Sequence, residues 1–519
     1  MMRKKIVWFS TALLLAAQLL TGCIGIRTAR ESEAPETAQP EAVTETVQTE
    51  EHPEPDIPEP VRMLKVAGSQ NWHWDYRENG SAEVYSPVLF LAEDGSVYPE
   101  LADLLKKTGE HMEMEAEKQF VELKKSLDEL PPMALYSRTE AAVERADSNY
   151  LSVLFVQDCY LGGAHPSRVY SCLNVESRTG KILKLSDFCS STEALLFRLG
   201  IALQNRYPDS LFGNLNAELA QEEKDGSLIW TVGYNGITFR FPGGTLAPYA
   251  SGDLTVFLSL KENADLLKES DYVAPDAWAA ALCADQEFFV DPDGSGVPAV
   301  LQAGGTVYDS EGQYFEGAYV SLNGSGSSRE AFFYSIRPYL VHTATGEERV
   351  YLELTSDNDY RSILVFQIDR GKVLGGSEEM YFGLTGTDGP GDTYGKMLTF
   401  DPEQFQLTTR LDALSTYDGV KTYHVGPSGT PETEDALYQI EYGPTLIAVR
   451  EIPVTDEDGN EMVLKPGEGI TLQKTDGSSV VVGETAEGKR VFHGAFSEWP
   501  QMIGELEAEE CFEEMFFAG

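Results

Sequence analysis

Histidines are the side chains that most often carry acid–base chemistry or bind a metal ion. The chain has seven, and no two of them have the spacing of a metal-ligand pair: His52, His73, His111, His165, His342, His424 and His493. The His-Glu-x-x-His and Gly-x-Ser-x-Gly signatures of common hydrolases are also absent. Carboxylates are abundant, but a sequence alone does not pair two of them as a glycosidase requires. We therefore predict no catalytic residue, no metal ion and no cofactor.

One histidine lies in a sequence suited to a tight turn, Gly162-Gly-Ala-His165-Pro166. Glycines adopt the backbone conformations that such a turn needs. We expect the imidazole of His165 to cap backbone groups of the turn. Contact with a ligand is the alternative.

A second polar segment, Asp291-Pro-Asp-Gly-Ser-Gly296, has the opening residues of a calcium-binding loop. It lacks a third acidic ligand, and Gln302 stands where the loop should end in glutamate. We predict a plain surface turn.

Cysteines suggest one cross-link. If the hairpin turns through residues 164–167, Cys159 lies opposite Cys172, close enough for a disulfide in an oxidising compartment. The alternative is two small buried thiols in a reducing environment.

The N-terminus has the pattern of an export signal. Arg3, Lys4 and Lys5 precede an apolar run over residues 6–20, whose helix would rise only about 22 Å, too short to span a bilayer. The following Leu-Thr-Gly-Cys23 is similar to a bacterial lipobox. We predict a signal peptide over 1–22, lipidation of Cys23 and a location on the outer face of the cytoplasmic membrane.

Residues 23–61 are rich in Pro and Glu and have the composition of an acidic tether. The whole chain is also acidic, with 39 Lys and Arg against 84 Asp and Glu. This balance argues against nucleic acid and against anionic membrane surfaces, so membrane attachment must come from the lipid alone. The excess charge serves solubility or attracts a cationic protein partner.

The folded region begins near residue 62. Apolar residues at helical spacing predict a helix over 112–130, which the prolines at 131 and 132 end. Alternation predicts strands at 151–158, 168–175, 228–233, 236–241 and 253–260, and Ser190 with Glu193 predicts the capping box of a second helix. This order predicts an α+β fold with antiparallel sheets and packed helices in the N-terminal half.

Two motifs in this region, Tyr160-Leu-Gly-Gly-Ala-His165 and the segment Thr179–Phe188, resemble the PdaC-type domain of bacterial peptidoglycan deacetylases. The segments 236–241 and 246–252 resemble the domain of unknown function that usually follows it. Together the pair resembles the extracellular part of RsiV-type, lysozyme-sensing anti-sigma factors. The likeness covers about residues 62–262, and the chain has neither the deacetylase's catalytic domain nor a cytoplasmic anti-sigma segment.

The resemblance implies a ligand-binding module in the cell envelope with no chemistry of its own. The binding residues it implies are Tyr160, Gly162, Gly163, His165 and Tyr249. The domains expected are a PdaC-like domain over 62–190 and an RsiV-like subdomain over 191–265.

The rest of the chain reads as β-rich. We predict a helical linker over 266–284, a β-rich domain over 285–445 with propeller-like repetition, and a small SH3-like barrel over 446–519 with a docked tail.

These features predict a membrane-anchored lipoprotein that binds cell-wall glycan or a cationic wall-active protein such as lysozyme. The alternatives are a wall-polymer hydrolase with a carboxylate pair and an envelope scaffold. Exposed Trp and Tyr along a surface would favour glycan, an acidic face would favour a protein, and a deep pocket with two carboxylates would favour an enzyme.

Overall fold

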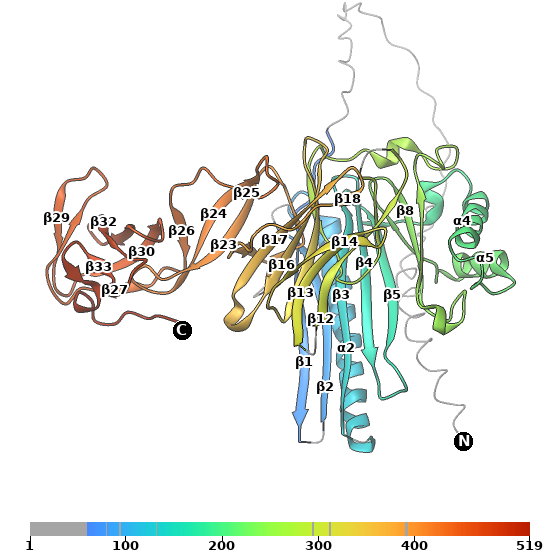
Figure 1. Ribbon diagram of the computed structural model, residues 1–519, viewed down its shortest axis with the longest axis horizontal. Helices are drawn as coiled ribbons and strands as arrows, with labels where there is room; N and C mark the ends of the chain where they lie inside the picture. Colours follow the sequence, from blue (N-terminus) through green and yellow to red (C-terminus); the bar gives the residue numbers. More distant parts are fainter. Residues whose placement is uncertain are drawn as a thin grey trace, which may run out of the picture.

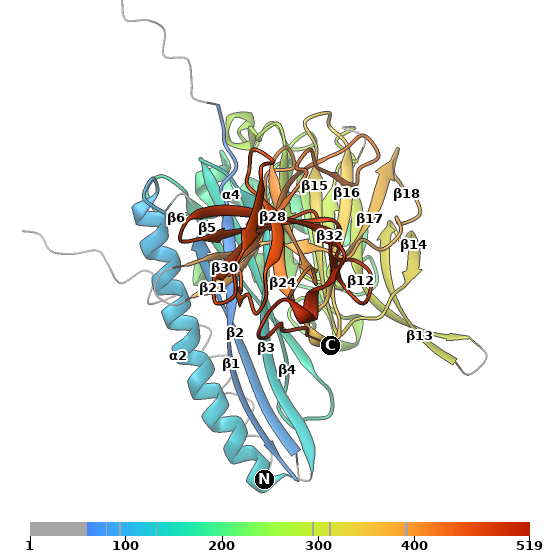
Figure 2. The ribbon, with the colours of Figure 1, turned by 90° about the vertical axis from the view of Figure 1, so that its left-hand side faces the viewer.

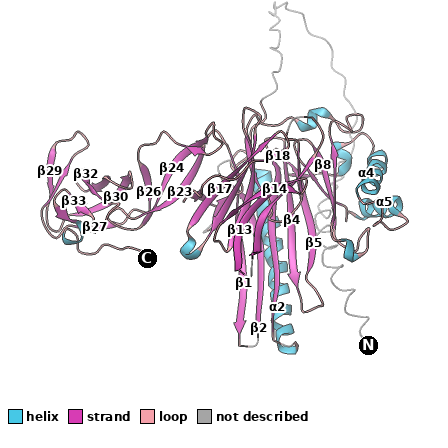
Figure 3. Ribbon diagram, in the orientation of Figure 1, coloured by secondary structure: helices cyan, strands magenta, loops and turns pink. Residues whose placement is uncertain are grey.

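The computed structural model describes residues 60–78, 80–92, 95–130, 132–292, 295–310, 313–389 and 393–518, without the side chains of 269, 306–310 and 313–316. The predicted signal peptide, Cys23 and nearly all of the tether lie outside these residues. In the part that is described, no helix is both long and apolar enough to cross a membrane. Strands predominate, and the first sheet lies between a C-terminal sheet at one end and helices at the other (Figures 1 and 3).

The first sheet has eight strands in the order β20-β21-β1-β2-β3-β4-β5-β6. Its strands are β1 (Val66–Arg77), β2 (Gly80–Leu91), β3 (Met133–Ala146), β4 (Tyr150–Tyr160), β5 (Ser167–Glu176), β6 (Lys181–Ile182), β20 (Gly386–Asp388) and β21 (Tyr394–Met397). β2 and β3 are parallel, and helix α2 (Pro99–Glu129) makes the crossover between them. The lower ends of β1, β2 and α2 extend beyond the rest of the molecule in two views (Figures 1 and 2).

Helix α2 covers one face of this sheet. Its buried stripe includes Leu101, Leu105, Ala116, Leu123 and Leu127, at the three- to four-residue spacing of one helix face. The predicted helix is confirmed, but it begins at Pro99 rather than 112, because Leu101 and Leu105 continue the stripe toward the N-terminus.

The hairpin of β4 and β5 has a different register from the predicted one. Cys159 pairs with Ser167, whereas Cys172 pairs with Leu154. Both cysteines are free thiols, and burial raises the pKa of each. The predicted register is therefore wrong, because the connecting loop begins at Leu161, earlier than the turn assumed, and of the two alternatives the structure has the free thiols.

A second unit contains helices and a small sheet with its own apolar core. Its elements are α3 (Leu185–Phe188), α4 (Thr192–Arg206), α5 (Leu215–Asp225), β7 (Ile229–Val232), β8 (Gly236–Phe241) and β9 (Leu254–Ser259). The three strands confirm the predicted ones. The helix cap differs by one residue, since Ser191 rather than Ser190 accepts the hydrogen bond from the Ala194 amide.

The middle of the chain forms two further sheets, ordered β18-β17-β16-β15-β10-β22 and β11-β12-β13-β14. Their strands are β10 (Trp278–Ala281), β11 (Phe288–Val290), β12 (Ala299–Ser310), β13 (Gln313–Leu322), β14 (Ser325–Glu330), β15 (Ser335–His342), β16 (Glu348–Thr355), β17 (Arg361–Asp369), β18 (Lys372–Val373) and β22 (Thr399–Phe400). The predicted helical linker is wrong at residues 278–281, where a fully buried strand pairs on both edges. One continuous core contains residues from Leu64 to Tyr423, so the segments 62–190 and 285–445 share a single interior.

The C-terminal sheet has thirteen strands and its own core. Its strands are β19 (Gly383–Leu384), β23 (Phe405–Leu411), β24 (Tyr417–Val425), β25 (Pro431–Glu432), β26 (Tyr438–Glu441), β27 (Thr445–Ile447), β28 (Ile452–Thr455), β29 (Glu461–Leu464), β30 (Gly469–Thr475), β31 (Val480–Thr485), β32 (Gly488–Ala495), β33 (Met502–Ile503) and β34 (Leu506–Glu507). Within the described residues no sheet closes on itself, so the predicted SH3-like barrel is wrong, and the β-rich region forms open sheets.

Replacing Glu222 on α5 by glutamine should remove a pH-dependent loss of stability. Burial and the neighbouring Glu218 carboxylate raise the pKa of Glu222 from 4.5 to about 7. The folded chain therefore holds this proton more tightly than the unfolded chain, and stability falls as pH rises from 4.5 to about 7. Thermal unfolding at about pH 8 should show Glu222→Gln more stable by roughly 2 kcal/mol, a value reduced for the solvent that reaches this half-buried side chain. At about pH 4 the two proteins should unfold alike, and a gain that persists there would contradict the assignment.

Candidate functional site

Strand β1 divides its side chains between two environments. Odd-numbered residues face α2, as the 2.7 Å contact between His73 Nε2 and Glu113 Oε1 shows. Since side chains alternate along a strand, Trp72, Trp74 and Tyr76 lie on the opposite face. They are 52%, 55% and 61% exposed, although large aromatic rings are usually more deeply buried.

The neighbouring strands add aromatic rings to the same face. Trp72 is paired with Tyr85 on β2, and Glu83, the register partner of Trp74, is paired with Tyr136 on β3. Tyr136 is in turn paired with Tyr160 on β4. We define the aromatic face by the residues that share this side of the four strands: Trp72, Trp74, Tyr76, Tyr85, Tyr136 and Tyr160.

The rings of the aromatic face are in contact with one another along β1 and across to β2. The ring centroids of Trp72 and Trp74 are 6.1 Å apart, and those of Trp74 and Tyr76 are 5.5 Å apart. The Tyr85 ring meets Trp72 edge-on at 5.6 Å. Such contacts hold each ring in place while leaving a broad apolar surface open to solvent.

The charges within the aromatic face are paired. Glu83 is buried beneath the rings, where it accepts hydrogen bonds from the Tyr85 hydroxyl and from Arg138 Nη2, the latter at 2.6 Å. Burial opposes the charge of Arg138, but the bond to Glu83 raises its pKa, and burial together with Glu83 raises the pKa of Tyr85. The Arg138 guanidinium also lies over the Tyr136 ring at 4.8 Å. At neutral pH the face therefore presents a neutral phenol and a charge-compensated Glu83–Arg138 pair.

A second ion pair lies at the β4 side of the aromatic face. Arg168 Nε donates to Asp158 Oδ1 at 2.7 Å, and the register places Asp158 opposite Arg138. Burial opposes the charge of Arg168, but the bond to Asp158 raises its pKa. Each carboxylate that interrupts the rings thus has its own guanidinium.

Four of the sequence-predicted binding residues lie at one border of the aromatic face. Tyr160 belongs to the face itself, and its hydroxyl donates to the Gly163 carbonyl at 3.1 Å. Gly162 has a φ of +83°, and a Cβ there would stand 2.5 Å from Leu130 Cδ1, so glycine is required by both conformation and space.

The structure also brings Tyr249 to this loop, although 83 residues separate it from Pro166. The rings of His165 and Tyr249 are stacked at 4.4 Å, and the Tyr249 hydroxyl donates to the Pro166 carbonyl at 2.8 Å. His165 Nδ1 lies 3.0 Å from the same carbonyl. The imidazole thus contacts the backbone of the turn, as expected, and an exposed stacked pair remains beside the aromatic face.

The tryptophans of β1 are not among the binding residues predicted from the sequence. Their signal is the alternation Trp72-His-Trp74-Asp-Tyr76, in which every second residue is aromatic. A strand with polar residues on its other face could have been predicted from this pattern. Its register against β2 to β4 could not, because it depends on the α2 crossover.

Comparisons with known proteins find solved structures of the DUF3298 family that are similar to part of the chain. One is a member of the DUF3298 family from Bacteroides fragilis, with 17% identity over 40% of this chain and 94% of that one, at a TM-score of 0.31. Another is a DUF3298 family protein from Pseudomonas aeruginosa, with 15% identity over 41% and 97%, at a TM-score of 0.29. No protein-family model and no curated protein matches the chain. The function proposed below therefore rests on the residues of the aromatic face.

Proposed function

We propose that the protein binds a glycan chain of the cell envelope on its aromatic face. Pyranose rings present surfaces of C–H groups with a partial positive charge, and these pack on the electron-rich faces of indole and phenol rings. Three exposed rings spaced along one strand suit a linear polymer, and this row is the observation that carries the proposal.

The polar groups beside the rings suit hydroxyl recognition. Arg138, whose side chain is 48% exposed, is a donor that lies among the rings, and its hydrogen bond to the buried Glu83 holds it in place. A sugar hydroxyl bonds to such pre-placed groups without reorganising them. Each of the two carboxylates has a guanidinium partner, so net charge contributes little to binding at this face. A neutral glycan suits such a surface.

Two other functions fit less well. The chain has 84 acidic and 39 basic residues, and this excess of negative charge favours a cationic protein such as lysozyme. At the aromatic face, however, Glu83 and Asp158 are each paired with an arginine. A hydrolase would need an acid and a base in contrasting environments, whereas Glu83 and Asp158 are both ion-paired. We therefore propose a binding protein without catalysis of its own.

The test is co-sedimentation of the soluble chain from Pro60 onward, which retains every described residue, with purified wall sacculi and, separately, its titration with lysozyme. We expect saturable binding to sacculi that changes little between low and physiological salt. Lysozyme binding that weakens steeply with salt, with no retention on sacculi, would replace the glycan proposal with the protein one.

We further propose that Cys23 anchors this module to the outer face of the cytoplasmic membrane. Replacing Cys23 by serine removes the thiol that carries the lipid and should release the chain into the medium or leave it unprocessed. Fractionation and immunoblotting of Cys23→Ser against the parent chain measure this. Normal processing with unchanged membrane association would refute the lipid anchor.

A further inference from the structure

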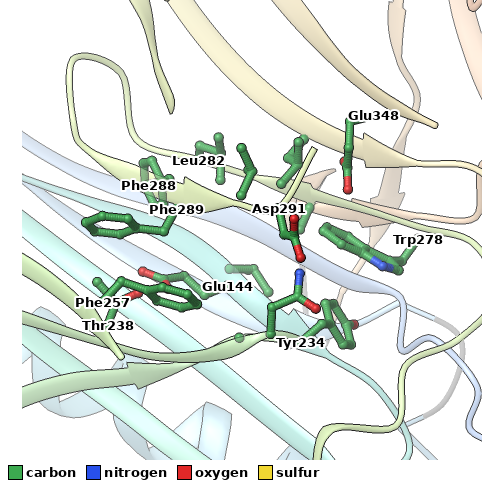
Figure 4. A pocket seen from close by; sticks show the side chains of 16 residues that line it. Glu144, Tyr234, Thr238, Phe257, Trp278, Leu282, Phe288, Phe289, Asp291 and Glu348 are labelled. Atoms are coloured by element: carbon green, nitrogen blue, oxygen red, sulfur yellow. The ribbon is translucent and has the colours of Figure 1, made fainter. Parts of the chain in front are cut away.

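A small pocket that shares no residue with the aromatic face lies where strands of four sheets meet. Its walls include Glu144 of β3, Trp278 of β10, Glu348 of β16, Asp291 after β11 and the turn residue Asn235 (Figure 4). The cavity volume is ≈ 50 Å³, which suits a single polar head group or a few waters and is too small for a sugar ring. Asn235 is exposed, so the pocket is accessible from solvent at that side.

Three carboxylates that line the pocket have a buried oxygen without a hydrogen-bond partner. These atoms are Glu144 Oε1, Asp291 Oδ1 and Glu348 Oε2. The Glu348 side chain is 7% exposed, and Figure 4 shows its carboxylate directed into the pocket. Burying a carboxylate oxygen without a hydrogen-bond donor costs free energy, so we expect a bound group to supply a donor at these positions.

The charges around the pocket leave a negative excess. Glu144 has Arg240 Nη1 at 2.7 Å, an ion pair whose angle does not make a hydrogen bond. The other oxygen of Glu348 contacts His342 Nδ1 at 3.0 Å, and the other oxygen of Asp291 accepts from the Gly296 amide. Glu348 and Asp291 thus lack a permanently charged partner among these contacts, and a cation is the occupant that would compensate them.

The kind of cation follows from the rest of the lining. Within the described residues no three acidic, histidine or cysteine side chains converge as metal ligands. The remaining walls are apolar and include Leu282, Phe288 and Leu340. A site with separated acceptors and apolar walls suits an ammonium group on a short alkyl chain, whose N–H donors point in several directions.

We infer that this pocket binds a primary alkylammonium group, with Glu348 and Asp291 as its principal acceptors. The group belongs to a small free amine or to the side chain of a lysine-like residue in a peptide. The inference is independent of glycan binding, because the aromatic face and the pocket share no residue.

The test is calorimetric titration of the soluble chain from Pro60 onward with n-butylammonium chloride, Nα-acetyl-lysine methylamide, n-butanol and potassium chloride. We expect saturable binding of butylammonium and none of butanol or potassium. Binding of the lysine derivative as well would identify a peptide source, whereas its failure would identify a free amine. Absence of butylammonium binding at millimolar concentrations, or equal binding of potassium, would overturn the inference.

Isosteric variants give the second readout. Glu348→Gln should weaken butylammonium binding about 30-fold or more, because one buried charge of the ion pair is lost. Without ligand, Glu348→Gln should unfold at a higher temperature than the parent chain, since it removes an uncompensated charge. Glu347→Gln, on the adjacent residue whose half-exposed side chain pairs with Arg349, is the matched control for binding and should leave the butylammonium affinity unchanged. Unchanged affinity in Glu348→Gln would contradict the assignment.

Discussion

Replacement of Trp72 and Trp74 by alanine should abolish retention of the protein on wall sacculi. Exposed aromatic rings at the centre of a binding surface typically contribute about 2 kcal/mol or more each, so each single variant should bind about 30-fold or more weakly. Both side chains are more than half exposed, so their removal leaves no cavity in the core. Binding isotherms on sacculi at two salt concentrations, with circular dichroism to check the fold, measure the effect.

The matched control for these tryptophans is Phe197→Ala on α4. Phe197 is 58% exposed, similar to Trp74, but it belongs to the helical unit with the separate core. This variant should bind sacculi like the parent chain. Equal loss in Phe197→Ala and Trp74→Ala, or full retention in both, would show that the aromatic face is not the glycan site.

Replacement of Arg145 by methionine should destabilise the fold by about 3–5 kcal/mol, because it leaves Asp147 buried without its ion partner. Both side chains are fully buried, and Arg145 Nε donates to Asp147 Oδ2 at 2.6 Å. The other two nitrogens of its guanidinium, Nη1 and Nη2, donate to the backbone carbonyls of Asp271 and Val273. Arg145 thus joins β3 to the segment that leads out of the helical unit. Urea unfolding followed by tryptophan fluorescence measures the loss.

A surface ion pair provides the comparison for Arg145. Arg198 Nη2 lies 2.6 Å from Asp265 Oδ2, but both side chains are substantially exposed. Arg198→Met should therefore cost at most about 1 kcal/mol. If Arg145→Met and Arg198→Met unfold at the same urea concentration, the buried Arg145–Asp147 pair contributes no more to stability than a surface pair.

The elements that could be predicted from the sequence are those whose hydrogen bonds join residues close together along the chain. The strands near 229, 236 and 254 and the C-terminal end of α2 follow from alternation, helical spacing and the proline stop. The same reasoning predicts the wrong element at residues 278–281. Trp-Ala-Ala-Ala has a good helix propensity, but pairing with β15 and β22 overrides it.

The candidate site was predictable only in part. Tyr160 and the His165 turn were identified from motifs that resemble a known domain, and they lie at the border of the aromatic face. The rings of β1 belong to the same surface only because the β1–β2 hairpin, the parallel crossover and the β3–β4 hairpin align residues from 72 to 160. The pairing of Cys159 failed for a related reason, since the length of one loop sets the register of the whole hairpin.

The attachment of β21 to the outer edge of β1 affects how this chain acquires its structure. Ala67 pairs with Met397 and Gly68 with Lys396, and next to them the Val66 amide donates to Thr399 Oγ1, a residue 333 positions further on. If the chain is exported N-terminus first, as the proposed lipid anchor requires, β1 emerges early, and its edge at Ala67 and Gly68 stays open until Lys396 and Met397 have followed. An unpaired strand edge can pair with a strand of another molecule, so self-association competes with folding during this interval. Secretion yield should therefore depend on how quickly residues 386–399 reach the same compartment.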